Sequence, residues 1–160
     1  MAGPHPEPVE QRTDSQDAEP DPAPDVPPLI LTVLLSSDPV VAQGRSRRFA
    51  QQCGYPDRAQ WELALAVSEL ATNILKYAQR GSLRIRFVSG CLPFVEVEAL
   101  DRGPGFTDTS LALRDGVSEG RDRWTAESLV GFRGLGTGLG AVARLSDELI
   151  IENRPRGGAR

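Results

Sequence analysis

The first patterned run of apolar positions begins at residue 29. Residues 29–35, "LILTVLL", form a short apolar run of β-forming side chains, which predicts a strand. "SSDP" then offers a helix N-cap and a proline for the first turn, and Gly54 offers a stop, so we expect a helix over about residues 40–52. A second start, "YPDRAQWE", predicts a longer helix that runs to about Gln79 and stops at Gly81.

The apolar positions of the longer helix recur with helical spacing. On a helical wheel, Val67, Leu70 and Ile74 lie within about 40° of Leu63. This stripe is predicted to face the core.

Two later segments alternate with a period of two, as strands with one buried face do. They are residues 83–87, "LRIRF", and residues 94–100, "FVEVEAL", with Ser89, Gly90 and Pro93 as turn residues between them. We expect a hairpin with an apolar surface (Leu83, Ile85, Val95 and Val97) and a charged one (Arg84, Arg86, Glu96 and Glu98).

The pattern weakens over residues 106–135, where glycines and charges are scattered and only a short helix is expected, around residues 109–114. A connection of that length in a compact domain is usually functional or mobile. "GTGLGAVARLSDE" then predicts a glycine-rich turn that runs into a helix, and "ELIIEN" predicts a strand after it.

Composition divides the chain into a tail and one domain. Residues 1–28 hold seven of the 22 acids, eight of the 13 prolines and a single base, so they lack the apolar surface needed to fold. We expect a disordered tail over residues 1–28 and one domain over residues 29–160. That domain has 15 acids and 17 bases, which does not indicate a nucleic-acid surface. The sequence shows no signal peptide and no long uncharged apolar span, so we expect a cytoplasmic protein that has no membrane segment.

Cysteine and histidine are too sparse for several kinds of site. Cys53 and Cys91 lie 38 residues apart without a CxxC pattern, and the only histidine, His5, is in the tail. A zinc site, histidine phosphorylation within the domain and a Ser-His-Asp triad are therefore disfavoured. Any chemistry must use carboxylates, amides, hydroxyls and the backbone.

Glu69 and Asn73 are four residues apart on the longer helix and share a face, roughly 90 to 120° from the apolar stripe. This spacing fits an ordinary solvated stripe. It also fits a site in which the carboxylate takes a proton and the amide oxygen binds Mg²⁺, an ion that prefers oxygen ligands. The spacing alone leaves both interpretations open.

Two glycine-rich stretches also have two interpretations each. "DRGPGF", residues 101–106, suits a turn after a strand, but Gly103 and Gly105 also allow close approach to a planar ligand while Asp101 accepts a hydrogen bond from an adenine-type amino group. "GLGTGLG", residues 134–140, is either a flexible connector or a phosphate-binding turn at a helix N-terminus.

Two familiar phosphate motifs do not fit these stretches. A Walker A loop needs GK[ST], whereas the only lysine is Lys76. "GTGLGA" matches the dinucleotide fingerprint formally, but only 20 residues follow Gly140, too few for the rest of a βαβ unit and its distal acid.

Three of these elements resemble the nucleotide-binding boxes of the GHKL, or Bergerat-fold, ATPases, and they occur along the chain in the same order as in that family. "ELATN" resembles the N box, "DRGPG" the first glycine box and "GTGLG" the second. "AVSELATNILKYAQRGSLRI", "DRGPGF" with "LALRDG", and "GLGTGLGAVARLSDEL" are similar to the switch-kinase branch of bacterial anti-sigma-factor serine/threonine kinases, over about residues 30–158. The resemblance implies an α/β (α+β) two-layer sandwich, with a mixed, mainly antiparallel sheet and helices on one face.

The resemblance also implies roles for individual residues. Asn73 would bind the Mg²⁺ that bridges the ATP phosphates, Glu69 would be the general base, and Asp101 would read the adenine amino group above Gly103 and Gly105. Residues 106–135 would form the ATP lid. The full nucleotide-binding set expected is Asn73, Asp101, Gly103, Gly105, Phe106, Arg133, Gly136, Thr137, Gly138, Leu139 and Gly140, in which Gly136, Gly138 and Gly140 wrap the phosphates and Arg133 reaches the γ-phosphate.

The function implied is an ATP-dependent serine/threonine protein kinase that uses Mg²⁺, phosphorylates a STAS-domain (anti-sigma-antagonist type) protein and then activates a PP2C-type phosphatase. Two alternatives stay open: an anti-sigma factor that sequesters a sigma subunit with ATP as a structural ligand, and a GHKL module that binds nucleotide or partner without turnover. Family members usually carry a Gly-Thr pair and a final strand after the position of "RPRGGAR". Here Ala159 stands in place of the threonine and the sequence stops at Arg160, so we expect weaker adenine binding if that strand is absent. The acidic tail is the second departure.

Overall fold

A three-stranded sheet forms one layer of the computed structural model, which describes residues 24–107, 117–118, 121–122, 138–155 and 157–160. Its strands are β1 (Leu29–Val33), β2 (Gly81–Val88) and β3 (Phe94–Asp101), in the order β1-β2-β3. Both pairings are antiparallel, so the described strands include no parallel pair of the kind that a mixed sheet contains. A separate short pair joins β4 (Val117–Ser118) to β5 (Arg121–Asp122).

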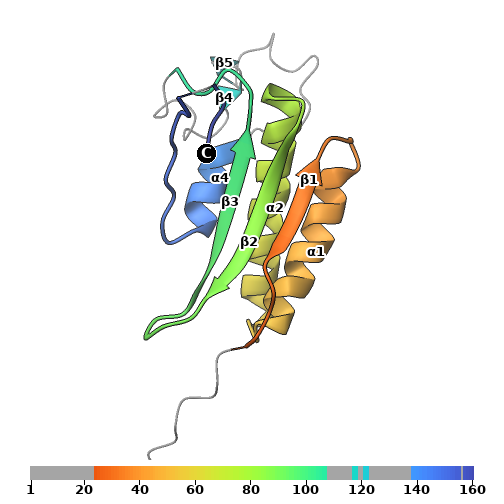
Figure 1. Ribbon diagram of the computed structural model, residues 1–160, viewed down its shortest axis with the longest axis vertical. Helices are drawn as coiled ribbons and strands as arrows, with labels where there is room; N and C mark the ends of the chain where they lie inside the picture. Colours follow the sequence, from red (N-terminus) through yellow and green to blue (C-terminus); the bar gives the residue numbers. More distant parts are fainter. Residues whose placement is uncertain (1–23, 108–116, 119–120, 123–137, 156) are drawn as a thin grey trace, which may run out of the picture.

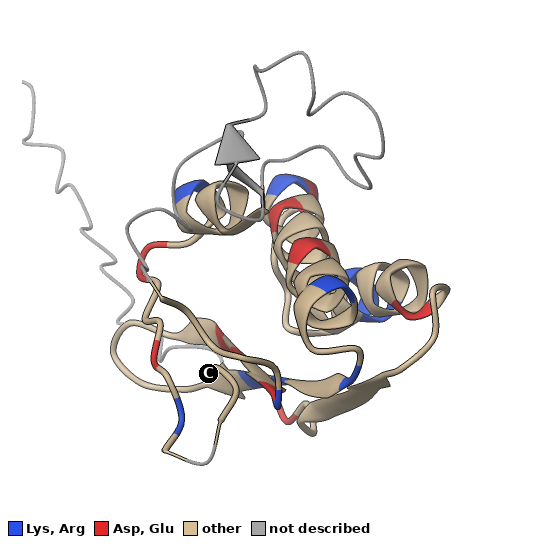
Figure 2. Cartoon of the chain, turned by 90° about the horizontal axis from the view of Figure 1, so that it is seen from above, with Lys and Arg blue, Asp and Glu red and all other residues tan. Residues whose placement is uncertain are grey.

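Helices cover one face of the sheet (Figure 1). They are α1 (Asp38–Gln52), α2 (Asp57–Tyr77) and α4 (Gly138–Leu145), and the view from above shows helices on one side and strands on the other (Figure 2). The two-layer α+β architecture is therefore confirmed. None of the described helices is both long and apolar enough to cross a membrane. The helix expected at residues 109–114 lies outside the described residues.

The core lies between the two layers and contains the apolar positions that the periodicity selected. Val67 and Ile74 of the predicted stripe are buried, and Leu63 and Leu70 pack against the same cluster while keeping some exposure. The buried cluster draws on β1, α1, α2 and β2: Leu31, Val33, Ala42, Phe49, Val67, Ala71, Ile74, Leu83 and Ile85.

The β2–β3 hairpin has the predicted charged surface. Arg84 is paired with Glu98 and Arg86 with Glu96 across the strands, and the Arg86 guanidinium binds the Glu96 carboxylate through two hydrogen bonds of 2.7 and 2.9 Å. The apolar positions point into the core, where Leu83 and Ile85 are fully buried and Val95 and Val97 are partly buried.

The junction between β1 and α1 differs from the expectation. The strand ends at Val33 instead of continuing to Leu35, and Ser37 stands at the N-cap position without a capping hydrogen bond from its side chain. The Asp38 carboxylate turns back instead and accepts hydrogen bonds from the N–H groups of Leu34 (2.7 Å) and Leu35 (2.8 Å). These two donors, Leu35 first, hold the pKa of Asp38 below its ordinary value. The Asp38 carboxylate thus binds the backbone N–H groups of the two residues that were expected to extend the strand.

The predicted stop of α2 at Gly81 is wrong. The helix ends at Tyr77, the residue with a left-handed backbone is Gln79 (φ 64°), and Gly81 is the first residue of β2. Gly81 is glycine for a packing reason, because an added Cβ would lie 2.5 Å from the Leu100 carbonyl oxygen and 2.8 Å from Ile74 Cγ2. That tight contact brings the end of α2 against the sheet.

The strand predicted for "ELIIEN" is also wrong. Residues 148–152 form no strand, because no described strand lies beside them, and Asn153 makes a single antiparallel bridge to Ala159. This bridge closes a hairpin in which Glu152 and Arg160 exchange two backbone hydrogen bonds of 2.9 Å each. The hairpin makes one backbone–backbone hydrogen bond to the sheet, from the Asp101 N–H to the Ala159 carbonyl at 3.2 Å, and Arg160 also pairs with Glu98 of β3 at 2.8 Å. Asp101 is thus the only residue of β3 with a backbone partner on that edge in the described part of the chain.

Candidate functional site

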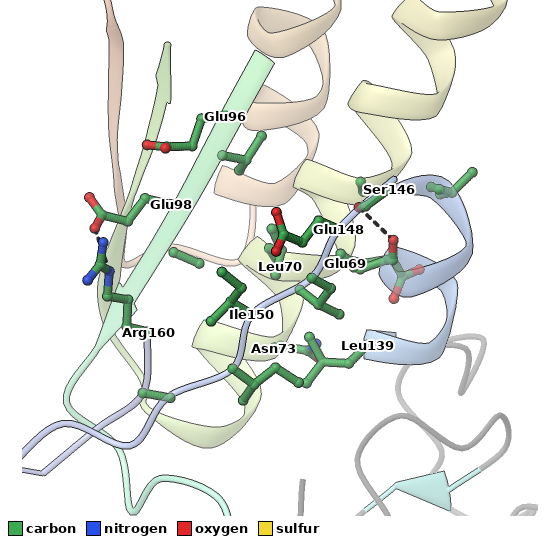
Figure 3. A pocket seen from close by; sticks show the side chains of 18 of the residues that line it. Glu69, Leu70, Asn73, Glu96, Glu98, Leu139, Ser146, Glu148, Ile150 and Arg160 are labelled. Carbon is green, nitrogen blue, oxygen red and sulfur yellow. Dashed lines mark hydrogen bonds and ion pairs between the residues drawn. The ribbon is translucent and has the colours of Figure 1, made fainter. Parts of the chain in front are cut away.

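A cleft of about 1330 Å³ opens between α2, β3, α4 and the segment that follows α4. Figure 3 shows Glu69, Asn73 and Leu139 on its helical side and the strand residues Glu96 and Glu98 opposite them. The sequence-predicted site residues that line it are Glu69, Asn73, Asp101, Gly105, Phe106, Gly138 and Leu139. Residues from three separate segments of the chain therefore meet in one cavity.

Glu69 and Asn73 face the beginning of α4. The Glu69 carboxylate accepts a hydrogen bond from the Gly138 N–H, and a Cβ added to Gly138 would lie 4.0 Å from Asn73 Oδ1. Burial raises the pKa of Glu69, and the bond from Gly138 acts in the opposite direction. Both side chains are half-buried and line the cleft, so neither is fully exposed to solvent.

This arrangement brings a carboxylate, an amide and a helix N-terminus together. The first N–H groups of a helix have no partner within the helix, and with the dipole they favour an anion such as phosphate. A carboxylate with a raised pKa is a better proton acceptor than an ordinary glutamate. The corner of the cleft at Gly138 can therefore hold an anionic group beside a proton acceptor.

Asp101 lies at the end of β3, where the turn interpretation and the ligand interpretation are compatible. Its Oδ1 accepts hydrogen bonds from the Gly103 N–H at 2.8 Å and from the Ala159 N–H at 3.1 Å. The first bond is the Asx turn that the sequence suggested. Because two donors already fill Oδ1, an amino group in the cleft would meet Oδ2.

The two glycines after Asp101 do different things. An added Cβ on Gly103 would lie 2.9 Å from the Tyr77 carbonyl oxygen and 3.0 Å from Ala78 Cβ, so this glycine packs on the end of α2 and does not line the cleft. Gly105 does line the cleft and has a left-handed backbone (φ 78°). A Cβ on Gly105 would come within 2.6 Å of Asn153 Oδ1.

Asn153 supports the site from outside the cleft, and the sequence did not indicate it. Its side-chain oxygen accepts from the Phe106 N–H at 2.7 Å, and its side-chain nitrogen donates to the Phe106 carbonyl at 2.7 Å. The neighbouring Arg154 donates from Nη1 to the Asp101 carbonyl at 2.9 Å. The C-terminal hairpin thus fixes the backbone on both sides of Gly103. An Asn-Arg-Pro sequence is typical of a turn, and it does not indicate contacts with residues about 50 positions away in the chain.

The replacement of threonine by Ala159 leaves the hairpin's contacts with Asp101 intact. Ala159 is buried and binds Asp101 only through its own N–H and carbonyl groups. Gly158 has a stricter requirement, because an added Cβ would overlap the Asp101 carbonyl oxygen and lie 2.7 Å from the carbonyl carbon. Backbone proximity, and not the side chain at 159, therefore closes this side of the cleft.

The second glycine stretch is only partly described. Gly138 begins α4, Leu139 lines the cleft while packing in a small cluster with Ala66 and Val142, and Gly140 is buried in the first turn without lining the cleft. Arg133, Gly136 and Thr137 lie outside the described residues.

The residues present suit a magnesium ion that takes most of its ligands from phosphate and water. The described residues contain no group of three or more His, Cys, Asp or Glu side chains arranged to hold a metal. Mg²⁺ commonly binds through one or two protein oxygens and keeps water and substrate phosphates in its shell. The Asn73 amide oxygen beside the start of α4 is compatible with such a site.

Comparison with known proteins agrees with this geometry. Residues 40–159 match the family described as histidine kinase-like ATPase domain, a region that spans Glu69, Asn73, Asp101 and Gly138. The chain is also 31% identical over 122 residues to "Serine/threonine-protein kinase RsbT" of Bacillus subtilis (strain 168), which covers 76% of this chain and 83% of that protein. An ATPase domain implies that ATP is a ligand. The chain therefore belongs to the histidine kinase-like (GHKL) ATPase family, in its switch-kinase branch of bacterial anti-sigma-factor serine/threonine kinases.

Proposed function

We propose that this protein is an ATP-dependent serine/threonine kinase that phosphorylates a STAS-domain protein in a bacterial sigma-factor partner-switching pathway. The observation that supports it best is the position of Glu69 beside the N-terminus of α4, in the cleft that also contains Asn73 and Asp101. The family resemblance adds activation of a PP2C-type phosphatase as a second role. Since ATP and sigma-pathway proteins are cytoplasmic, the proposal includes a cytoplasmic location.

In the proposed reaction the hydroxyl oxygen of a serine or threonine attacks the γ-phosphorus of ATP. A new O–P bond forms, the bond from the γ-phosphorus to the bridging oxygen breaks, and ADP leaves with that oxygen. Glu69 takes the hydroxyl proton, which its raised pKa favours. Phosphoryl transfer depends mainly on positioning and electrostatics, so a site without His or Cys is adequate.

The other site residues position the nucleotide. Asn73 would hold Mg²⁺, which supplies positive charge to the phosphates when bound. Asp101 would accept a hydrogen bond from the adenine amino group through Oδ2, because its Oδ1 is held by Gly103 and Ala159. The N–H groups at the start of α4 would bind phosphate oxygens.

Glu69→Gln tests the general base. The variant is expected to bind ADP and ATP at the parental affinity, while transfer of labelled phosphate to a STAS domain falls by roughly 10² to 10⁴, the usual contribution of a general base. Glu62→Gln is the matched control, because Glu62 lies on the same helix, lines the same cleft and is paired with Arg58 at 2.8 Å. Transfer by Glu69→Gln at the parental rate would remove Glu69 from the chemistry.

Asn73→Ala tests the metal site. Calorimetric titration with ATP should show that Mg²⁺ strengthens binding to the parent but not to the variant. Thr72→Ala is the control, since the Thr72 hydroxyl donates to its own helix at the Ser68 carbonyl (2.8 Å).

If transfer to every STAS domain of a panel is absent while a sigma subunit is captured at micromolar concentration, the anti-sigma function replaces the kinase function.

A further inference from the structure

The outer surface of α1 and α2 combines exposed apolar side chains with arginine. The Arg47 guanidinium of α1 stacks over the Trp61 ring of α2, with Cζ 4.0 Å from the ring centroid. Trp61 is 51% exposed, and Leu65, one turn further along α2, is 41% exposed. We call this surface the Arg47–Trp61 face and define it by Arg47, Arg48, Trp61 and Leu65. Tryptophan and arginine are the residues most enriched in the strongly contributing parts of protein interfaces.

No acidic side chain among the described residues pairs with the arginines of the Arg47–Trp61 face. Arg47 and Arg48 form no ion pair within the described ranges, whereas Arg58 nearby is bound to Glu62 at 2.8 Å. Within the same described part, Arg47 Nε is buried and makes no hydrogen bond. A buried donor without a partner costs free energy, so an acceptor that draws the guanidinium into a new pairing would relieve that cost.

The acidic N-terminal segment joins the body near this face. Val26 packs against the core cluster, as does Cys53 at the end of α1. Figure 1 shows the chain entering β1 at the end of the molecule where α1 finishes and α2 starts. Trp61 belongs to the second turn of α2, close to that end.

The segment is long enough to reach every part of the face. A flexible chain of about 20 residues spans roughly 25 Å between its ends, and the 15 residues of α1 extend for about 22 Å. Residues 1–23 carry six acids and a single base, Arg12, so their charge is opposite to that of the face. Their prolines also suit a tryptophan surface, since proline-rich segments dock on aromatic side chains without needing ladder hydrogen bonds.

We propose that residues 1–23 dock on the Arg47–Trp61 face of the same molecule, with their carboxylates paired to Arg47 and Arg48 and their prolines against Trp61. The open edge of β3 is a poorer site for them, because proline cannot donate to a strand ladder. Tethering gives the tail a local concentration near the millimolar range, so weak pairs suffice to hold it. The contact is electrostatic and exposed, so salt should release it.

The test is the indole N–H resonance of Trp61 in the full-length protein, followed by two-dimensional NMR. Trp124→Phe assigns the resonance, because the chain has two tryptophans. The comparison variant carries Gln at Glu7, Glu10 and Glu19 and Asn at Asp14, Asp17 and Asp21, which neutralises the tail without shortening it. We expect the Trp61 resonance to differ between parent and variant at 50 mM NaCl and to coincide at 1 M NaCl. A synthetic peptide of residues 1–23 should move the variant's resonance toward the parental position.

Substitutions on the body locate the contact. Arg48→Gln should abolish the difference between the acidic and the neutralised tail, whereas Arg84→Gln on the outer face of the sheet should preserve it. A Trp61 resonance at the same position in parent and variant at low salt would overturn the proposal and leave the face to a partner protein. A difference that disappears on dilution would also overturn it, because the occupant would then be the tail of a second copy.

Discussion

The contact between Gly158 and Asp101 gives the sharpest test of how the cleft is closed. Gly157 and Gly158 both have left-handed backbones, with φ of 84° and 90°. An added Cβ on Gly157 would be 3.9 Å from its nearest neighbour, the Gly103 carbonyl oxygen, whereas on Gly158 it would overlap the Asp101 carbonyl oxygen. Alanine at the two positions therefore imposes the same backbone strain and differs only in the space available.

The expected magnitudes follow from that difference. Left-handed backbone costs a residue with a Cβ about 1–2 kcal/mol, which is the whole effect expected for Gly157→Ala. Gly158→Ala must also move Ala159 away from Asp101 and so loses the hydrogen bonds of 3.1 and 3.2 Å, each contributing about 1 kcal/mol. The free energy of unfolding should therefore fall by about 2 kcal/mol more for Gly158→Ala than for Gly157→Ala.

Thermal unfolding and nucleotide titration measure the two consequences. For a chain of 160 residues, 2 kcal/mol corresponds to about 4–8 °C in Tm. Calorimetry with ADP should show a larger loss of affinity for Gly158→Ala, because Asp101 is no longer held by Ala159. Equal Tm and equal affinity in the two variants would refute the reasoning that close backbone approach at Gly158 positions Asp101.

Three further predictions concern other parts of the chain. Gly44→Ala should raise the free energy of unfolding by about 1 kcal/mol, measured by urea denaturation, because Gly44 is inside α1 and an added Cβ meets nothing within 4 Å; a loss of stability would contradict this. Asn153→Ala should lower it by about 1–3 kcal/mol through loss of both bonds to Phe106, and an unchanged free energy of unfolding would contradict this. Burial raises the pKa of Glu69 in the folded protein. The free energy of unfolding of the parent is therefore highest below the ordinary pKa of a glutamate and falls as the pH rises through the raised pKa. The stability of Glu69→Gln relative to the parent should therefore increase with pH across that window, whereas parallel pH profiles would contradict the burial.

Local periodicity was sufficient to predict the parts of the fold that depend on neighbours in sequence. The alternation in residues 83–87 and 94–100 predicted the hairpin and its charged surface, on which Arg86 pairs with Glu96, because a period of two fixes which side chains share a face. The apolar stripe of α2 was predicted in the same way, and so was a helix after the last glycine stretch. The spacing of Glu69 and Asn73 predicted a shared face, and only the structure shows that α4 covers it.

Contacts between distant segments account for what could not be predicted. In the sequence, Gly81 was interpreted as a helix stop and Gly103 as a turn or ligand-contact residue. In the structure each allows close packing, Gly81 against Leu100 and Gly103 against the end of α2. The role of Asn153 depends on Phe106, which is 47 residues away and gives no local signal. The apolar run "ELIIEN" has strand composition, but composition cannot supply the neighbouring strand that a ladder requires.

The edge of β3 that faces the cleft has a consequence for the protein at high concentration. Among the described residues, only Asp101 of this strand has a backbone partner on that side, and Leu92 and Phe94 at its other end are 87% and 50% exposed. A bare strand edge flanked by apolar side chains is a template on which another polypeptide can add, and natural proteins usually protect it with charge, proline or a covering segment. A segment or partner that covered this edge would therefore also limit self-association, and purified samples should be kept dilute.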